Sequence, residues 1–249
     1  IPGISEICEV DTLQICNIDS TNIAPDIWVL MTDTIREKYE QYDGFVVTHG
    51  TDTMAYTAAA LSYMIQDSPK PIIITGAQKP INVEITDSKT NLFDSFLYAA
   101  SDSASGVQIV FNGKVILGTR ARKTHSKSFQ AFSSINYPYL AIIQDGRVIS
   151  YITKDKAPAP RFYDILDAKV ALFKLTPGVD SEILSYMLER NDAIIIESYG
   201  VGGIPSAPEY GYFEVINHWI RKGKTVVMTT QVPNEGSDME IYKVGHELK

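Results

Sequence analysis

The 249-residue sequence has little of what marks several large protein classes. It contains two cysteines, Cys8 and Cys16, whose spacing matches neither a zinc pattern nor a disulfide framework, so we expect a reducing compartment. No apolar run approaches the roughly 18 residues that a membrane-spanning helix requires. The opening residues 1–3 do not begin a signal peptide. These absences argue against a membrane protein and against a secreted, disulfide-rich protein.

Basic residues are fewer than acidic ones. Lys and Arg total 22 against 30 Asp and Glu, which gives a formal net charge of -8. No overall field therefore draws the chain to phosphate backbones or anionic lipid, and we expect neither a nucleic-acid nor a membrane partner. Hydrophobic residues make up 45% of the chain, enough for one large core or two modest ones.

Two kinds of ligand motif are also missing. There is no GxGxxG fingerprint and no Walker-type lysine loop, and the glycines of residues 200–203 are only superficially similar. The four histidines are too far apart for metal-ligand spacing, so we expect no metal site: His49, His125, His218 and His246. His49 is expected to make a structural hydrogen bond.

Apolar runs alternate with helix-length segments along the first part of the chain. The pattern predicts strands at residues 44–48, 71–75 and 107–111, with helices over 52–66 and 91–101. Strands that alternate with helices favour a parallel sheet covered on both faces. Asn-Gly at 112–113 and Asp-Gly at 145–146 predict two hairpins, so we expect antiparallel strands at the sheet edge.

The composition changes at residues 154–163, where charges precede Ala-Pro-Ala-Pro-Arg. This stretch cannot continue a helix or a central strand, and it predicts an interdomain linker. The alternation then resumes, with predicted strands at 170–175, 193–198 and 225–230 and helices near 181–189 and 213–221. The predicted fold class is α/β, with a larger N-terminal domain (residues 1–153) holding a mostly parallel sheet flanked by helices and a smaller C-terminal α/β domain (164–249).

The most polar cluster, HGTDT at residues 49–53, follows the first predicted strand. Ligands of parallel α/β sheets bind beyond the carboxyl ends of the strands, where helix N-termini favour anionic groups. Thr51 and Asp52 could be ordinary N-cap residues. Three such residues in succession exceed the need of one cap, which favours a functional site.

Two further polar segments follow. The connection over residues 75–91 is longer than a crossover needs, and Asp87 within it is expected to be the N-cap of the next helix. Residues 118–129 are rich in basic side chains, a pattern usual for a solvated face. A buried lysine there would act as a neutral proton acceptor, but spacing does not choose which one.

Five segments resemble the bacterial-type L-asparaginases in order and spacing: HGTDTMAYTA (49–58), TGAQKP (75–80), TDSKTNL (86–92), RARKTHSKSF (120–129) and SYGVGG (198–203). The resemblance covers nearly the whole chain. TMAYTAAALSYM is more similar to the cytoplasmic type I branch than to the periplasmic type II branch.

The resemblance implies hydrolysis of L-asparagine to L-aspartate and ammonia, without metal or cofactor, in a cytoplasmic homodimer or homotetramer. It implies a threonine nucleophile assisted by a Thr-Lys-Asp relay, in which Lys123 accepts a proton from Thr51 and Asp52 holds the ammonium group. An unactivated threonine is a poor nucleophile and needs an adjacent base, which agrees with this set.

The resemblance also implies the substrate-binding groups. Asp19, Ser20 and Thr21 resemble the Asp-Ser-Ser segment that receives the substrate's α-carboxylate, and Asp52 would also accept from its α-amino group. Ala77 stands where the family uses a backbone group to hold the scissile amide. A zwitterionic substrate needs donors at one end and a carboxylate at the other.

The sequence departs from the family pattern in three places. The family's first catalytic threonine lies in a Gly-Gly-Thr-Ile motif that these residues do not contain, so we expect Ile1 not to be the natural start. The family also continues beyond the final HELK, so we expect further sequence there. Gly203 stands where many relatives carry an Asn that reaches a neighbouring subunit.

Two alternatives remain open at this point. One is the amidase subunit of a tRNA-dependent amidotransferase, which would release ammonia for use on a charged tRNA. The other is a non-catalytic asparagine-binding regulatory module that kept the fold.

Overall fold

The structure, a computed structural model, describes residues 3–153 and 155–238. The chain forms two compact units, one ending at Leu166 and one beginning at Asp167. Each unit combines a sheet with helices, which confirms the expected α/β class. His246 and the predicted end of the smaller domain lie outside the described residues, as does Lys154 in the predicted linker.

Unit 1 is built on a six-stranded sheet in the order β1-β3-β4-β5-β8-β9. Three parallel strands form one half, and all three were predicted: β1 (Phe45–Thr48), β3 (Pro71–Thr75) and β4 (Gly106–Phe111). Antiparallel strands form the other half: β5 (Lys114–Leu117), β8 (Ala141–Gln144) and β9 (Arg147–Ser150). The predicted antiparallel edge is therefore confirmed.

Both predicted hairpins are present, between β4 and β5 and between β8 and β9. Asn112 and Gly113 have φ of 50° and 68°, and Asp145 and Gly146 have 51° and 68°. Two successive positive φ angles are what a two-residue type I′ turn requires, and Asn-Gly and Asp-Gly adopt them at low cost.

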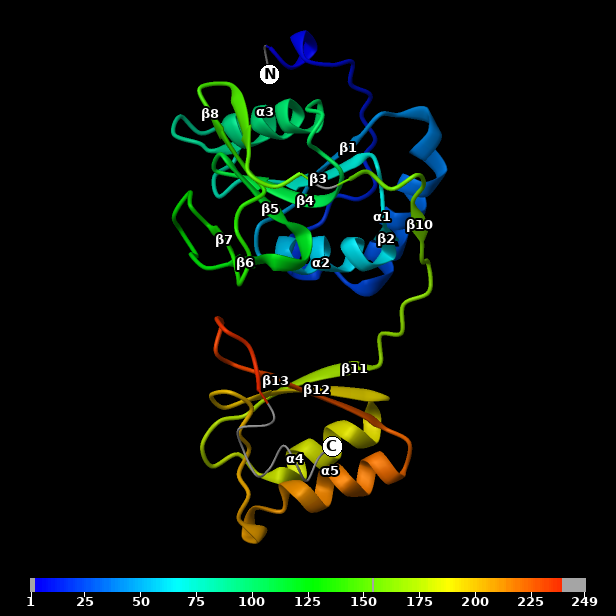
Figure 1. The fold of residues 1–249 in the computed structure, drawn as a ribbon, viewed down its shortest axis with the longest axis vertical. Helices are drawn as coiled ribbons and strands as arrows, with labels where there is room; N and C mark the ends of the chain where they lie inside the picture. Colours follow the sequence, from blue (N-terminus) through cyan, green and yellow to red (C-terminus); the bar gives the residue numbers. More distant parts are fainter. Residues whose placement is uncertain (1–2, 154, 239–249) are drawn as a thin grey trace. The chain divides into compact units, whose positions relative to one another are not determined.

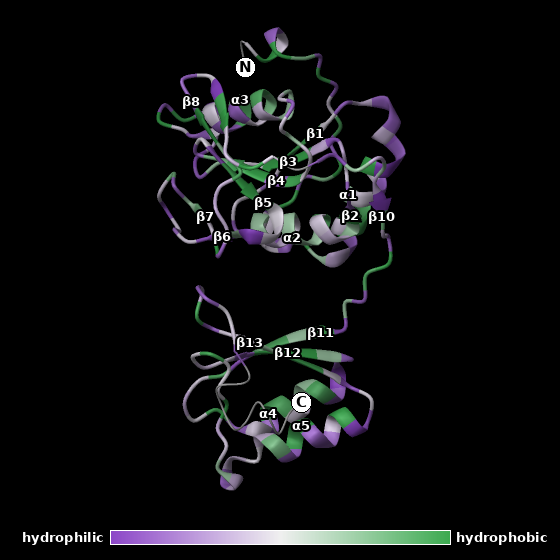
Figure 2. Cartoon of the chain, in the orientation of Figure 1, coloured by the Kyte–Doolittle hydropathy of each residue, from purple (hydrophilic) through white to green (hydrophobic). Residues whose placement is uncertain are grey.

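Helices cover the sheet of unit 1 on both faces (Figure 1). One face carries α2 (Met54–Met64) and α1 (Pro25–Lys38), and α3 (Ser88–Ala99) lies on the other. Figure 2 shows the apolar strands between these layers. The side chains of β3 are fully buried, as the apolar run predicted. The helix α1 was not predicted, although Pro25 in its first turn is typical of a helix start.

Short elements join these layers. They are the 3-10 turns η1 (Ile4–Glu6), η2 (Ser20–Asn22), η3 (Tyr39–Gln41) and η4 (Gly118–Arg120), and a ribbon of β6 (Ala121–Lys123) with β7 (Phe132–Ser134).

The last part of the predicted linker belongs to unit 1. Residues Arg161–Phe162 form β10, which pairs antiparallel with β2 (Ile65–Gln66) at the end of α2. Phe162 packs edge-on against Tyr39, with ring centroids 5.5 Å apart. The chain therefore leaves unit 1 only after this pair.

Unit 2 has a parallel three-stranded sheet in the order β11-β12-β13. Five of its elements match the predicted ones: β11 (Val170–Lys174), α4 (Ser181–Arg190), β12 (Ala193–Ser198), α5 (Tyr212–Arg221) and β13 (Thr225–Thr230). The 3-10 turn η5 (Pro208–Tyr210) was not predicted. Both helices lie on one face of this sheet (Figure 1). Asp180 caps α4 by accepting a 2.9 Å bond from the backbone N–H of Glu182.

Among the described residues, no helix has both the length and the apolar character needed to cross a membrane. Both cysteines are free.

A carboxyl group of α3 is buried in unit 1. Asp94 is 7% exposed, on the helix face that also buries Asn91, Ser95 and Tyr98. Burial raises the pKa of Asp94 from its ordinary value near 3.8 to about 6. Protonation is therefore easier in the folded state than in the unfolded state, and the free energy of unfolding falls as pH rises between these two values.

We predict that Asp94→Asn stabilises unit 1 above pH 7 by on the order of 3 kcal/mol, at about 1.4 kcal/mol per pH unit, and has little effect near pH 3.5. Urea unfolding at both pH values measures this difference. The exposed Asp43→Asn is the matched control. A gain that is equal at both pH values would contradict the prediction.

Candidate active site

The candidate site lies where β1 and β3 end. The two strands are parallel, with Thr48 paired to Thr75, and the backbone N–H of His49 donates to the carbonyl of Thr75 at 2.8 Å. Gly76 follows directly, and a Cβ placed on it would lie 2.0 Å from the carbonyl oxygen of His49. Only glycine permits this approach, so the loops after the two strands lie against each other.

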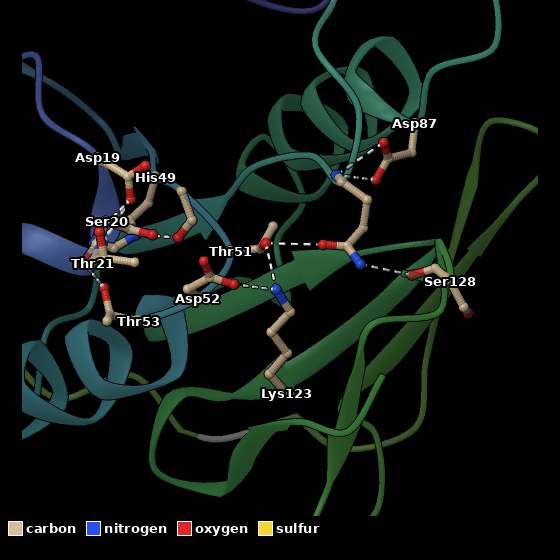
Figure 3. Close-up of polar contacts among 12 residues, drawn as sticks. Asp19, Ser20, Thr21, His49, Thr51, Asp52, Thr53, Asp87, Lys123 and Ser128 are labelled. Carbon is tan, nitrogen blue, oxygen red and sulfur yellow. Dashed lines mark hydrogen bonds and ion pairs between the residues drawn. The ribbon is translucent and has the colours of Figure 1, made fainter. Parts of the chain in front are cut away.

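Lys123 reaches this point from β6 (Figure 3). Its Nζ donates to Thr51 Oγ1 at 2.8 Å and to Asp52 Oδ1 at 2.6 Å. The lysine side chain is 18% exposed, whereas that of Asp52 is 59% exposed. Of the basic residues in the 118–129 segment, Lys123 is the one that contacts the HGTDT loop, a choice that spacing alone did not make.

Neither Thr51 nor Asp52 caps α2. The N-cap position belongs to Thr53, and its side chain makes no cap bond but donates to the carbonyl of Ser20 at 2.7 Å. Thr51 also donates to Gln78 Oε1 at 2.9 Å. The ordinary explanation of these polar residues as helix caps is therefore wrong, because their side chains bond to segments outside α2.

The segment of residues 19–21 docks on the HGTDT loop. Besides the bond from Thr53, Ser20 lies so close to Gly50 that a Cβ on this glycine would be 2.7 Å from Ser20 Oγ. Asp19 accepts from Thr21 N at 2.9 Å and Thr21 Oγ1 at 2.8 Å, and these bonds lower the pKa of its carboxyl. Ser20 is buried, while Asp19 and Thr21 are exposed.

Ala77 lines a cavity of about 360 Å³. The cavity lies between the two strand ends and the start of α3, and Thr51, Asp52 and Lys123 are not among its lining residues: Thr48, His49, Gly50, Thr75, Gly76, Ala77, Ile81, Ser88 and Leu92. Ala77 therefore lies in the loop after β3, next to Gln78, which bonds to Thr51.

Asp87 has a different part from the one predicted. It occupies the N-cap position of α3 but makes no cap bond. Its carboxylate accepts instead from the backbone N–H groups of Gln78 and Lys79 at 2.9 to 3.0 Å and from Asn91 Nδ2 at 3.1 Å. The predicted cap is therefore wrong in its contacts: Asp87 anchors the loop after β3.

The expected structural hydrogen bond of His49 is present, and it belongs to a series of hydrogen bonds that runs from Trp28 to Gly50. Trp28 Nε1 donates to Thr57 Oγ1 at 2.9 Å, so the hydroxyl hydrogen is available to His49 Nε2 at 2.9 Å. His49 Nδ1 then donates to the Gly50 carbonyl at 2.6 Å. This is the neutral tautomer, and burial correspondingly lowers the pKa of His49.

Sequence reasoning missed Gln78 and Thr57. The small residues around Gln78 in TGAQKP indicate a close backbone approach, but nothing local shows that the amide reaches a loop 50 residues away. Thr57 lies within a predicted helix, where a threonine carries no distinctive signal. Within the part of the chain that the structure describes, no group of three His, Cys, Asp or Glu residues could hold a metal ion.

Two family profiles match the sequence and together cover most of it. Residues 1–156 match "Asparaginase, N-terminal", and residues 169–249 match "Glutaminase/Asparaginase C-terminal domain". An L-asparaginase of Thermococcus kodakarensis is 39% identical over 238 residues, which is 95% of this chain and 72% of that protein. A glutamyl-tRNA(Gln) amidotransferase subunit of Methanococcus vannielii is 34% identical over 265 residues, which cover the whole of this chain but 61% of that protein.

Solved structures agree with these matches. The thermostable L-asparaginase from Thermococcus kodakarensis superposes with a TM-score of 0.91 at 39% identity, over 96% of this chain and 72% of that one. A probable cytoplasmic L-asparaginase from Campylobacter jejuni gives a TM-score of 0.82 at 29% identity, over 93% and 75% of the two chains. With both profiles matched in order and the polar loops placed at the strand ends, the chain belongs to the asparaginase family.

Proposed function

We propose that this protein is an amidohydrolase that converts L-asparagine to L-aspartate and ammonia. The observation that carries the proposal is the pair of bonds from Lys123 Nζ to Thr51 Oγ1 and Asp52 Oδ1 at the carboxyl end of β1. Membership of the asparaginase family and the names of its relatives support the same reaction.

Thr51, Asp52 and Lys123, which we call the lysine cluster, are suited to transfer a proton. Asp52 orients Lys123, and Lys123 in its neutral form accepts the proton of a threonine hydroxyl through Thr51 Oγ1. The activated oxygen attacks the side-chain amide carbon, the C–N bond breaks, and the proton passes to the departing nitrogen to give ammonia. Water then hydrolyses the ester formed between the threonine oxygen and the substrate's carbonyl carbon, which releases L-aspartate and restores the threonine hydroxyl, so each turnover consumes one water molecule.

The groups around the cluster fit a zwitterionic amino acid. Asp52 is more than half exposed, so its carboxylate has room to accept from the substrate's α-amino group while Oδ1 holds Lys123. The segment of residues 19–21, docked on the same loop, would receive the α-carboxylate through its backbone and hydroxyl groups. The backbone at Ala77 would hold the scissile amide. We assign the whole protein to the cytoplasm as a homodimer or homotetramer without a cofactor.

A second candidate rests on a specific observation. The relative from Methanococcus vannielii is named as an amidotransferase subunit, and this chain aligns with it over its full length. The same lysine cluster would then release ammonia for transfer to a charged tRNA. Ammonia release that depends on added glutamyl-tRNA would favour this candidate, and release that is independent of it favours the hydrolase.

The first prediction concerns the reaction itself. Protein expressed from the complete gene is expected to release ammonia from L-asparagine, with L-glutamine assayed in parallel and the 249-residue chain beside it. Coupled-enzyme detection of ammonia measures both rates. If the complete protein releases ammonia from neither amide, the hydrolase proposal fails and calorimetric binding of asparagine becomes the test of a regulatory module.

The second prediction concerns the proton acceptor. Lys123→Met should lower kcat by about 10²- to 10⁴-fold, the range typical of a lost general base, and leave folding nearly intact because the ion pair is partly exposed. Lys127→Met, in the exposed part of the same segment, is the matched control and should keep the parental rate. Turnover of the Lys123 variant near the parental rate would remove this residue from the mechanism.

A further inference from the structure

Gln78 makes hydrogen bonds to three different segments. Its backbone N–H donates to the carboxylate of Asp87, its Oε1 accepts from Thr51 Oγ1 at 2.9 Å, and its Nε2 donates to the carbonyl of Ser128 at 3.1 Å. Ser128 lies in the loop between β6 and β7, the ribbon that carries Lys123. Gln78 therefore joins the loop after β3 both to the HGTDT loop and to the lysine ribbon.

The orientation of the Gln78 amide follows from its partners. A backbone carbonyl only accepts hydrogen bonds, so the NH₂ end must face Ser128 and the oxygen must face Thr51. The Thr51 hydroxyl accordingly donates to Gln78, and the lone pairs of Thr51 Oγ1 are turned toward Lys123. Lys123 Nζ donates to this oxygen and to Asp52.

We propose that Gln78 is a positioning residue that sets the resting direction of the relay, by holding the hydrogen of Thr51 away from Lys123 and a lone pair toward it. The inference rests on the proposed function, because it concerns the same lysine cluster. In the resting site Lys123 therefore donates to Thr51 Oγ1, and turnover requires the Thr51 hydroxyl to leave Gln78 and turn toward Lys123.

Among the described residues, two carboxylates contact Lys123 or Gln78. Asp52 faces Lys123 from the loop before α2, and Asp87 holds the backbone of Gln78 from the start of α3. A change of the Gln78 side chain alone leaves both carboxylates in place. It therefore alters the direction of the Thr51 hydroxyl without removing the ion pair.

Two substitutions separate positioning from packing. Gln78→Met keeps the length of the side chain but accepts no bond from Thr51, so the Thr51 hydrogen is free to turn to Lys123 and favour the neutral amine. Gln78→Glu still accepts from Thr51 but places a negative charge two hydrogen bonds from Lys123, which favours the ammonium form. Gln130→Met, an exposed glutamine in the β6–β7 loop, is the control.

The pH profile of kcat in the full-length protein is expected to move in opposite directions. The acid limb should shift to lower pH in Gln78→Met and to higher pH in Gln78→Glu, each by about 0.5 to 1 pH unit. At the optimum kcat should fall about 10- to 100-fold in Gln78→Met with KM within about twofold, as expected for lost geometry rather than lost substrate binding. The control should match the parent in all three quantities.

A second readout does not need turnover. Acylation of Lys123 by acetic anhydride, followed by mass spectrometry with Lys127 as internal standard, should be faster in Gln78→Met and slower in Gln78→Glu than in the parent. Equal labelling in the three proteins would overturn the inference even if all remain active. A parent that releases no ammonia would refute the proposed function instead, and the labelling rates would still decide the role of Gln78.

Discussion

The contact between Gly76 and the carbonyl oxygen of His49 is the constraint on which the rest of the site depends. A side chain of any size at Gly76 would overlap this oxygen, so β1 and β3 could not end side by side. Their adjacent ends bring the HGTDT loop and the loop after β3 together, and Thr51 then lies within hydrogen-bond distance of Gln78. The geometry of the candidate site thus depends on glycine at position 76.

Around this contact, the polar residues of the HGTDT loop divide their partners. Thr53 turns to Ser20, Asp52 to Lys123, and Thr51 to both Lys123 and Gln78. Each bond ties the loop to a segment distant in sequence, so the loop is held from three sides. In the proposed proton transfer only the Thr51 hydroxyl has to turn, while the backbone of the loop stays fixed, and such preorganisation lowers an activation barrier.

The sequence predicted the parallel strands well because short runs rich in Val and Ile alternate with helix-length segments, and the hairpins because Asn-Gly and Asp-Gly permit two positive φ angles. It missed α1, whose apolar residues stand mainly in one continuous run (27–31) instead of at helical spacing, and misjudged Asp87. An aspartate before a helix is usually a cap, and only the tertiary structure shows the backbone N–H groups of Gln78 and Lys79 turned toward it. Contacts between distant loops leave no periodic signal in a sequence.

The strand order in unit 1 places the turn between β8 and β9 at the opposite edge of the sheet from the candidate site. The β8–β9 hairpin ends the sheet opposite β1, and a Cβ on Gly146 would meet no atom within 4 Å. An exposed hairpin tip of this kind is where folded chains best tolerate added sequence. The turn at residues 145–146 is therefore the natural attachment point for a fluorescent label or an inserted reporter domain, at the far edge of the sheet from Thr51 and Lys123.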